Sequence, residues 1–216
     1  MKPDRCFYFQ LINHDKKLSM INFFAVLVVF IYSCSDSSNG NKIVTPITID
    51  IQPFSDISSE QIKFVHQELS KIYPKILIRK SIDLPLSAYY RERNRYRADT
   101  IIRFLRNQAQ EGHLIIALTN KDISQTKGSI KDYGIMGLGL CPGNACVASS
   151  FRVSKTDHWS QFFKVAIHEL GHTQGLPHCL VKTCFMRDAA GGNPTNEETG
   201  FCPKCKAHLV SRGWAL

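Results

Sequence analysis

Residues 168–178 read HELGHTQGLPH, a short stretch that holds three histidines, a glutamate and two glycines. His168 and His172 are four residues apart, so on a helix they lie one turn apart on the same face. Both imidazoles can therefore bind one metal ion. Residues 157–174 carry apolar side chains at helical spacing, which predicts that this helix forms.

The same stretch supplies a base and a third ligand. Glu169 follows the first histidine, so its carboxylate lies beside the metal without taking a coordination position, where it can accept a proton from water. Gly175 can end the helix with a positive φ, and the turn that follows brings His178 to the same metal. Three histidines leave a fourth position open, which is typical of a catalytic zinc ion that lowers the pKa of water to about 7.

The alternative interpretation is a helix whose histidines are ordinary surface or core residues. HExxH alone occurs in unrelated chains, but HExxHxxGxxH on a predicted helix is far more specific. In the alternative, Glu169 and Gly175 would have no function. A metal site that has lost its activity is a second alternative, although every role in the pattern is filled.

Four cysteines follow in two pairs, Cys179 with Cys184 and Cys202 with Cys205. Their spacing suits tetrahedral zinc, and four thiolates leave no open position. We therefore predict a structural zinc ion that joins the segment after the helix to the C-terminal tail. Disulfides are the competing interpretation, because the N-terminal sequence indicates export to an oxidising compartment. The spacing favours zinc.

A third cysteine pair lies in a glycine-rich segment, residues 133–153, which predicts a loop and an edge strand. Cys141 and Cys146 have no partners in the four-cysteine set. They either form a small-loop disulfide or stay free. Residues 137–147 are expected to form part of a cleft wall.

The N-terminus indicates export. Residues 21–32, INFFAVLVVFIY, are too few to span a bilayer as a helix, but with Lys16 and Lys17 before them they fit a signal peptide. Ser33 and Cys34, followed at once by polar residues, resemble a bacterial lipobox, in which cleavage leaves Cys34 as a lipid-carrying N-terminus. A plain signal peptide, or a signal anchor with an incidental cysteine, is the alternative.

The order of patterns along the chain predicts an α/β layer fold. Residues 1–33 are predicted as a lipoprotein-type signal peptide, 34–42 as a flexible tether and 43–216 as a peptidase domain. Apolar runs predict strands at 43–54, 75–79 and 113–119, the last nearly all apolar and so central in its sheet. Helices are predicted from Ser58 or Ser59 to Pro74 and at 99–109, and residues 91–97 are expected to be a basic loop.

Composition is that of an ordinary globular protein. The 216 residues are 44% hydrophobic and 21% charged, which excludes disordered and fibrous classes. The formal net charge of +9 predicts a solvated basic face, with attraction to anionic surfaces or acidic substrates as the alternative.

Residues 168–186, HELGHTQGLPHCLVKTCFM, followed by CPKC at 202–205, are similar to the archaemetzincin signature HExxHxxGxxHCxxxxCxM with a distal CxxC. The resemblance spans roughly residue 43 to the C-terminus. It implies a compact metzincin-like (zincin) fold, with a mixed twisted sheet packed against the active-site helix and a zinc-held irregular C-terminal subdomain. It also implies that Met186 is the Met-turn methionine beneath the catalytic zinc.

These patterns predict a zinc metallopeptidase with two zinc ions, one catalytic and one structural. We expect a monomer that acts on peptide or protein substrates, is held at a membrane of the cell envelope through a lipid on Cys34, and has no nucleic-acid partner. Endopeptidase and aminopeptidase action both remain open. The rival is a catalytically silent, zinc-stabilised module that binds peptides or nucleic acid, for which the basic charge and the CxxC argue. In that rival, Glu169 would be idle.

Overall fold

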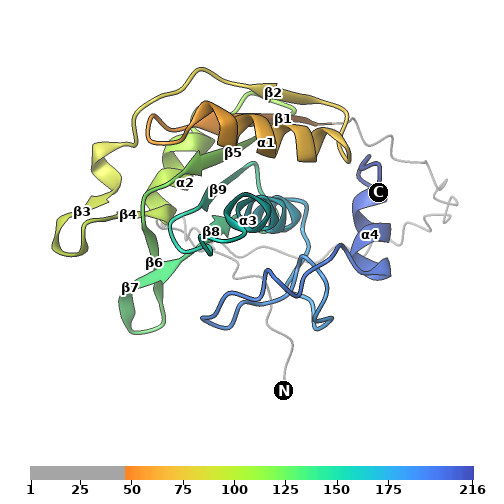
Figure 1. The fold of residues 1–216 in the computed structure, drawn as a ribbon. Coiled ribbons are helices and arrows are strands. Elements are labelled where there is room, and N and C mark those ends of the chain that lie inside the picture. Colours follow the sequence, from red (N-terminus) through yellow and green to blue (C-terminus); the bar gives the residue numbers. More distant parts are fainter. Residues whose placement is uncertain (1–46) are drawn as a thin grey trace, which may run out of the picture. The chain divides into compact units, whose positions relative to one another are not determined.

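The computed structural model describes residues 47–216, so the predicted signal peptide, Cys34 and the tether lie outside the described residues. A central sheet and four helices make up most of this part. They are β1 (Thr48–Pro53), α1 (Ser59–Ser70), β2 (Ile76–Ile78), α2 (Ala98–Arg106), β5 (His113–Thr119), β8 (Gly137–Gly139), β9 (Ala145–Ser149), α3 (His158–Thr173) and α4 (Pro203–Val210). The strand order is β2-β1-β5-β9-β8 (Figure 1). Only β8 runs antiparallel to its neighbour, so the predicted mixed sheet is confirmed.

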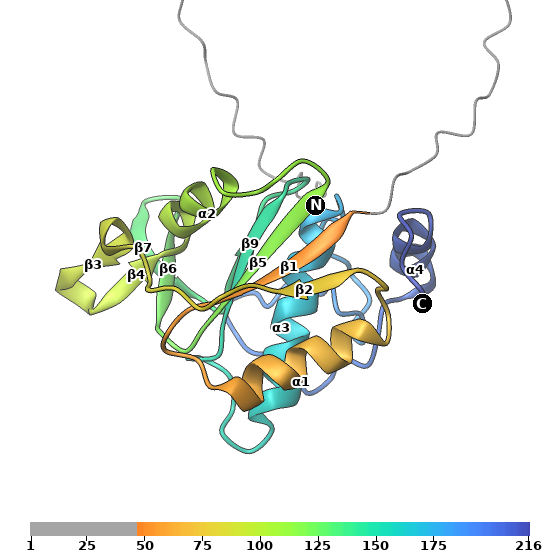
Figure 2. The same cartoon turned by 90° about the horizontal axis from the view of Figure 1, so that it is seen from above.

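Helices cover both faces of this sheet, α1 and α3 on one side and α2 on the other (Figures 1 and 2). Successive side chains of the central strand β5 point to opposite faces of the sheet, which explains the arrangement. Leu114, Ile116 and Leu118 belong to the core shared with α1 and α3, whereas Ile115 and Ala117 belong to the core shared with α2. Each fully buried leucine or isoleucine stabilises the fold by roughly 1.5–3 kcal/mol. The predicted central position of residues 113–119 is confirmed.

The helix predicted to begin at Ser58 or Ser59 has Ser58 as its N-cap. The Ser58 side chain accepts a hydrogen bond from the backbone N–H of Gln61, and the Gln61 side chain accepts one from the backbone N–H of Ser58. Such a capping box satisfies two backbone donors, and losing an N-cap side chain typically costs about 1 kcal/mol.

No helix between residues 47 and 216 combines the length and apolar character that crossing a membrane requires.

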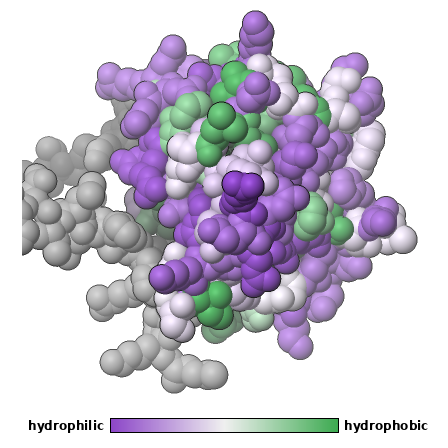
Figure 3. Space-filling model, turned by 90° about the vertical axis from the view of Figure 1, so that its left-hand side faces the viewer, coloured by the Kyte–Doolittle hydropathy of each residue, from purple (hydrophilic) through white to green (hydrophobic). Residues whose placement is uncertain are grey.

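A smaller sheet of order β3-β4-β6-β7 lies beside the first. Its strands are β3 (Tyr89–Tyr90), β4 (Arg95–Arg97), β6 (Ile123–Lys127) and β7 (Ile130–Ile135). The prediction of a loop over residues 91–97 was therefore wrong for β4. Arg95 tolerates a place in the sheet because its guanidinium pairs with Asp122 at 3.0 Å and Asp132 at 3.1 Å. The side of the molecule that carries this sheet is largely hydrophilic (Figure 3).

Two further predictions were incomplete. The glycine-rich segment 133–153 contains the predicted edge strand, β8, but also β9, which lies inside the central sheet between β5 and β8. All five residues of β9 are buried, because small side chains let helices pack closely on both faces. The C-terminal part, predicted as irregular, includes the helix α4. It begins with Pro203, whose fixed φ and missing N–H suit the first helical turn.

The structure does not join Cys141 to Cys146. Cys146 is a free thiol with none of its surface exposed, because β9 turns its side chain into the core between the sheet and α3. The sulfur of Cys141 lies instead 3.5 Å from the carbonyl oxygen of Leu176. The small-loop disulfide is therefore wrong, and Cys146 matches the alternative of a free thiol.

Candidate active site and metal centres

The end of α3 forms the turn on which the histidine stretch depends. The N–H of Gly175 donates to the carbonyl of His172 at 2.8 Å, and the N–H of Leu176 donates to the carbonyl of Gly171 at 3.1 Å. This pair of bonds is a Schellman motif, which requires a left-handed residue just past the helix end. Gly175 adopts φ +93, as the sequence predicted. The chain reverses there and returns His178 toward the helix.

Three imidazoles converge as a result. The ring centroids of His168, His172 and His178 are 4.7, 4.9 and 5.4 Å apart in their three pairs. One nitrogen from each ring lies within 4.8 Å of the others, so the group can hold a metal ion. Zinc takes imidazole nitrogen at about 2.0–2.1 Å and is tetrahedral, so three such ligands leave one position for substrate or water. The donor set therefore fits a catalytic zinc ion.

Backbone carbonyls fix which nitrogen faces the metal position. The Nδ1 of His168 lies 2.6 Å from the carbonyl oxygen of Phe185, and the Nδ1 of His172 lies 2.8 Å from that of Leu176. A carbonyl only accepts, so each Nδ1 donates and each Nε2 keeps a free lone pair. Burial lowers the pKa of His168 well below its ordinary value and that of His172 to about 4. Both rings are therefore neutral, the form that binds metal.

Glu169 lies beside this group with 7% of its surface exposed, and burial raises its pKa to about 8. The strand β8 passes directly over it. A Cβ on Gly137 would lie 2.5 Å from Oε1 of Glu169, and a Cβ on Gly139 would lie 2.6 Å from the Glu169 carbonyl oxygen. Only glycine allows this close approach. The sequence led us to expect residues 137–147 in the cleft wall, but not that Gly137 and Gly139 leave room for Glu169. The alternating Gly137-Leu138-Gly139 could have indicated this close approach.

Met186 packs against the same helix. Its side chain is fully buried, and a Cβ on Gly171 would overlap its sulfur. The glycine inside HELGH therefore leaves room for the methionine. The Met186 carbonyl also accepts a 2.7 Å hydrogen bond from the N–H of Cys179, which follows His178. This bond ties the methionine turn to the third histidine.

The four cysteines also come together. One sulfur from each of Cys179, Cys184, Cys202 and Cys205 lies within 4.8 Å of the others, and all four are free thiols, so the disulfide alternative is wrong. The sulfurs of Cys179 and Cys202 are 3.7 Å apart. A disulfide needs about 2.05 Å, whereas tetrahedral zinc with Zn–S bonds of about 2.3 Å separates its sulfurs by about 3.8 Å. The sulfur geometry therefore fits zinc.

Backbone amides surround these sulfurs. The N–H groups of Cys202 and Met186 both point to the sulfur of Cys184, at 3.3 and 3.5 Å. Burial alone would raise the pKa of Cys202, but hydrogen bonds from the Cys205 backbone and the neighbouring thiols lower it to about 7. Burial raises the pKa of Cys184 and of Cys205, so the lowered pKa of Cys202 makes it the member of the cluster that most readily forms the thiolate that binds metal.

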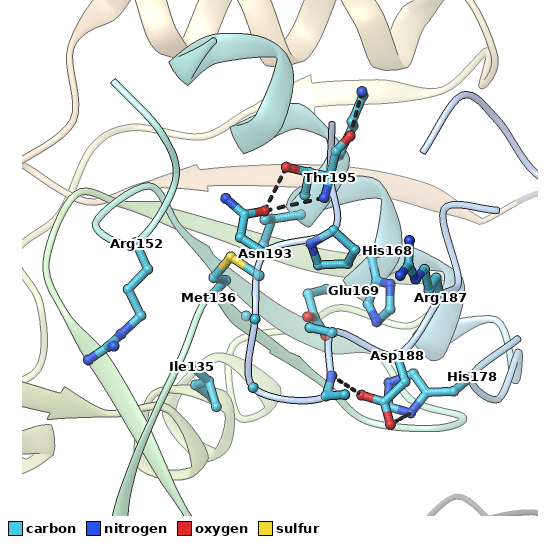
Figure 4. A pocket seen from close by; sticks show the side chains of 18 of the residues that line it. Ile135, Met136, Arg152, His168, Glu169, His178, Arg187, Asp188, Asn193 and Thr195 are labelled. Carbon is cyan, nitrogen blue, oxygen red and sulfur yellow. Dashed lines mark hydrogen bonds and ion pairs between the residues drawn. The ribbon is translucent and has the colours of Figure 1, made fainter. Parts of the chain in front are cut away.

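A cleft of about 350 Å³ opens at the histidines. One wall is the end of β7 and the start of β8, with Ile135 and Met136, and the other is the loop over residues 188–195 (Figure 4). Asp188 of that loop lies 3.7 Å from the Nδ1 of His178. Lys164 also lines the cleft, together with Glu198. Sequence reasoning missed both; Lys164 had a signal, because it precedes His168 by four residues on the same helix face.

Comparison of the sequence with known proteins consistently finds one peptidase family and the archaemetzincins. A family model described as Peptidase family M54 matches residues 27–211. The archaemetzincin of Halobacterium salinarum is 27% identical over 172 residues, covering 73% of this chain and 96% of that protein. The archaemetzincin of Archaeoglobus fulgidus is 29% identical over 166 residues, covering 74% and 98%.

Solved structures agree with the fold. The crystal structure of archaemetzincin from Archaeoglobus fulgidus is similar with a TM-score of 0.65 and 26% identity, covering 75% of this chain and 99% of that one. The archaemetzincin structure from Methanopyrus kandleri gives a TM-score of 0.66 at 23% identity, covering 80% and 97%. At that identity the second likeness supports the fold alone.

Proposed function

Since the chain belongs to peptidase family M54 and is a zinc metallopeptidase, we propose that it cleaves peptides or proteins at the cell envelope, using His168, His172 and His178 as zinc ligands. The observation that supports these ligands is the convergence of three imidazoles at the cleft, with Glu169 beside them. A monomer with one such cleft is sufficient for the reaction.

The residues of the cleft divide the chemistry of hydrolysis. Zinc, when bound by the three imidazoles, polarises the scissile carbonyl and lowers the pKa of water to about 7. Glu169 accepts the proton as the water oxygen attacks the carbonyl carbon, and then delivers that proton to the leaving nitrogen as the C–N bond breaks. The Phe185 and Leu176 carbonyls hold the imidazoles of His168 and His172 in the ligand tautomer. The glycines of β8 keep the wall close to Glu169.

We further propose that the four-cysteine group holds a second, structural zinc ion. Four sulfurs at tetrahedral spacing leave no place for substrate. Its position in the chain supports a bracing role, because Cys179 directly follows His178 and Cys184 directly precedes Phe185.

The test of the catalytic function is hydrolysis of a peptide library in water enriched in ¹⁸O. We expect new peptide ends whose carboxyl groups contain one solvent oxygen, because water attacks the carbonyl directly. A chelator should stop the reaction, and added zinc should restore it. Peptides that bind without being cut under any of these conditions would instead favour the silent binding module.

The lipid anchor is tested at Cys34, which lies outside the described residues. In cells fed labelled palmitate, the parent chain should carry the label and sediment with membranes. Cys34→Ala should lose the label, since the thioether sulfur is gone, whereas Cys6→Ala, in the leader itself, should keep it. A Cys34→Ala chain that still carries the label would refute the lipobox assignment.

A further inference from the structure

Glu198 is a buried acid that the catalytic reaction does not use. It lines the cleft together with His168, yet only 4% of its surface is exposed. Burial raises its pKa to about 7, although Lys164 and Arg187 nearby act in the opposite direction. Among the acidic cleft residues that the structure describes, Glu169 and Glu198 have no hydrogen bond or ion pair, whereas Asp188 pairs with His178.

The cations around Glu198 are already engaged. Lys164 donates to the Thr195 carbonyl at 2.8 Å. Arg187 pairs with Glu197 at 2.7 Å. Further along the cleft, Arg152 makes two bonds to Asp122 at 2.8 and 2.9 Å, and Lys127 lies over the ring of Tyr133. Each of these positive charges has a partner within the protein, whereas the Glu198 carboxylate has none among the described residues.

The pocket around Glu198 is held in a fixed shape next to the reacting bond. Lys164 lies one turn before His168 on α3, so the pocket extends about 6 Å along the helix from His168 to Lys164. The opposite wall is tied to α3 because Gln161 accepts a 2.8 Å bond from Asn193 and Lys164 donates to Thr195. Figure 4 shows Asn193 and Thr195 on the wall that faces the cleft. A residue of an extended peptide rises about 3.3 Å, so this pocket receives a side chain adjacent to the scissile bond.

We propose that Glu198 is a specificity-determining residue that selects substrates with a cationic side chain, lysine or arginine, next to the scissile bond. This inference rests on the proposed peptidase function and specifies its substrate class. A cation would supply the partner that the Glu198 carboxylate lacks. An acidic side chain would be repelled, and an apolar one would leave the carboxylate buried without a partner, which is costly.

The experiment compares peptides that are identical except for lysine or norleucine, placed in turn on each side of the scissile bond. Norleucine keeps the aliphatic chain and lacks the ammonium group. At one of the two positions, the parent should cut the lysine peptide with kcat/KM about 10- to 100-fold higher, the range expected for a charged hydrogen bond. Glu198→Gln should reduce this ratio to within about threefold of unity, and Glu198→Asp should retain part of it.

Glu197→Gln is the matched control, because it removes a neighbouring carboxylate that pairs with Arg187 on the surface and should leave the ratio unchanged. Equal cleavage of both peptides by the parent, or a lysine preference that survives in Glu198→Gln, overturns the proposal while the peptidase function stands. If the parent cuts neither peptide, the peptidase function fails. The affinities of the two peptides for the parent and Glu198→Gln, measured by fluorescence anisotropy, then decide the role of Glu198.

Discussion

Glu169→Gln is expected to lower kcat/KM for peptide hydrolysis by about 10²- to 10⁴-fold, the range that a general base contributes. Glutamine has the same shape as glutamate and fits beneath Gly137, where the wall leaves no spare room. It cannot accept the proton from the attacking water. Because Glu169 takes no coordination position, the three histidines should bind zinc as before.

The measurement combines kcat/KM on one peptide with zinc content and the thermal unfolding midpoint of each purified chain. Glu68→Gln, the same substitution on a solvent-facing turn of α1, should retain full activity. A Glu169→Gln chain that keeps its zinc and loses less than tenfold in activity would show that another group moves the proton. Loss of zinc in that chain would instead mean that Glu169 supports the metal.

The histidine site was predictable because its geometry is local. Four-residue spacing on a helix brings His168 and His172 together, and the glycine that ends the helix directs His178 back within three residues. Neither step depends on where the sheet lies. The cysteine cluster was predictable for the same reason within each pair, although only the fold brings Cys202 beside Cys179.

Other elements escaped prediction because their stability comes from partners distant in sequence. The strand β9 has small residues and no alternation, and its place inside the sheet depends on β5 and β8. The strand β4 consists of Arg95, Tyr96 and Arg97, and it forms because acids from later in the chain neutralise its first arginine. The helix α4 buries only Cys205 and Leu209, so its periodicity is weak; Pro203 at its start was the usable signal.

The groups that orient the metal-binding histidines could not be predicted for a different reason. The carbonyl of Phe185 that fixes the tautomer of His168 is present in every residue type, so no side chain marks it. Its position depends on the fold of the cysteine segment, where the Phe185 N–H donates to the Gly200 carbonyl at 2.9 Å and Cys184 lies one residue before. The structural and catalytic sites are therefore connected through one peptide unit.

That connection leads to the second large effect. Cys205→Ala should remove the second zinc ion, because three thiolates and a methyl group no longer complete the tetrahedron. Structural zinc in small domains contributes about 10–16 kcal/mol of folding free energy, far more than the 0.5–3 kcal/mol of a typical substitution. We expect residues 179–202 to lose order, while the sheet core keeps its structure. Hydrogen exchange should therefore rise in that segment and stay slow in β5.

The same variant should also weaken zinc binding at the histidines by about 10- to 100-fold, because His168 loses its orienting carbonyl. Native mass spectrometry gives the number of ions, and competition with a chromogenic chelator gives the affinity of the one that remains. Cys146→Ala removes a buried free thiol outside the cluster and should leave both ions bound. Two ions in Cys205→Ala would refute the structural zinc site. One ion held at the histidines with the affinity of the parent would show that the cysteine cluster supports the tail without orienting His168.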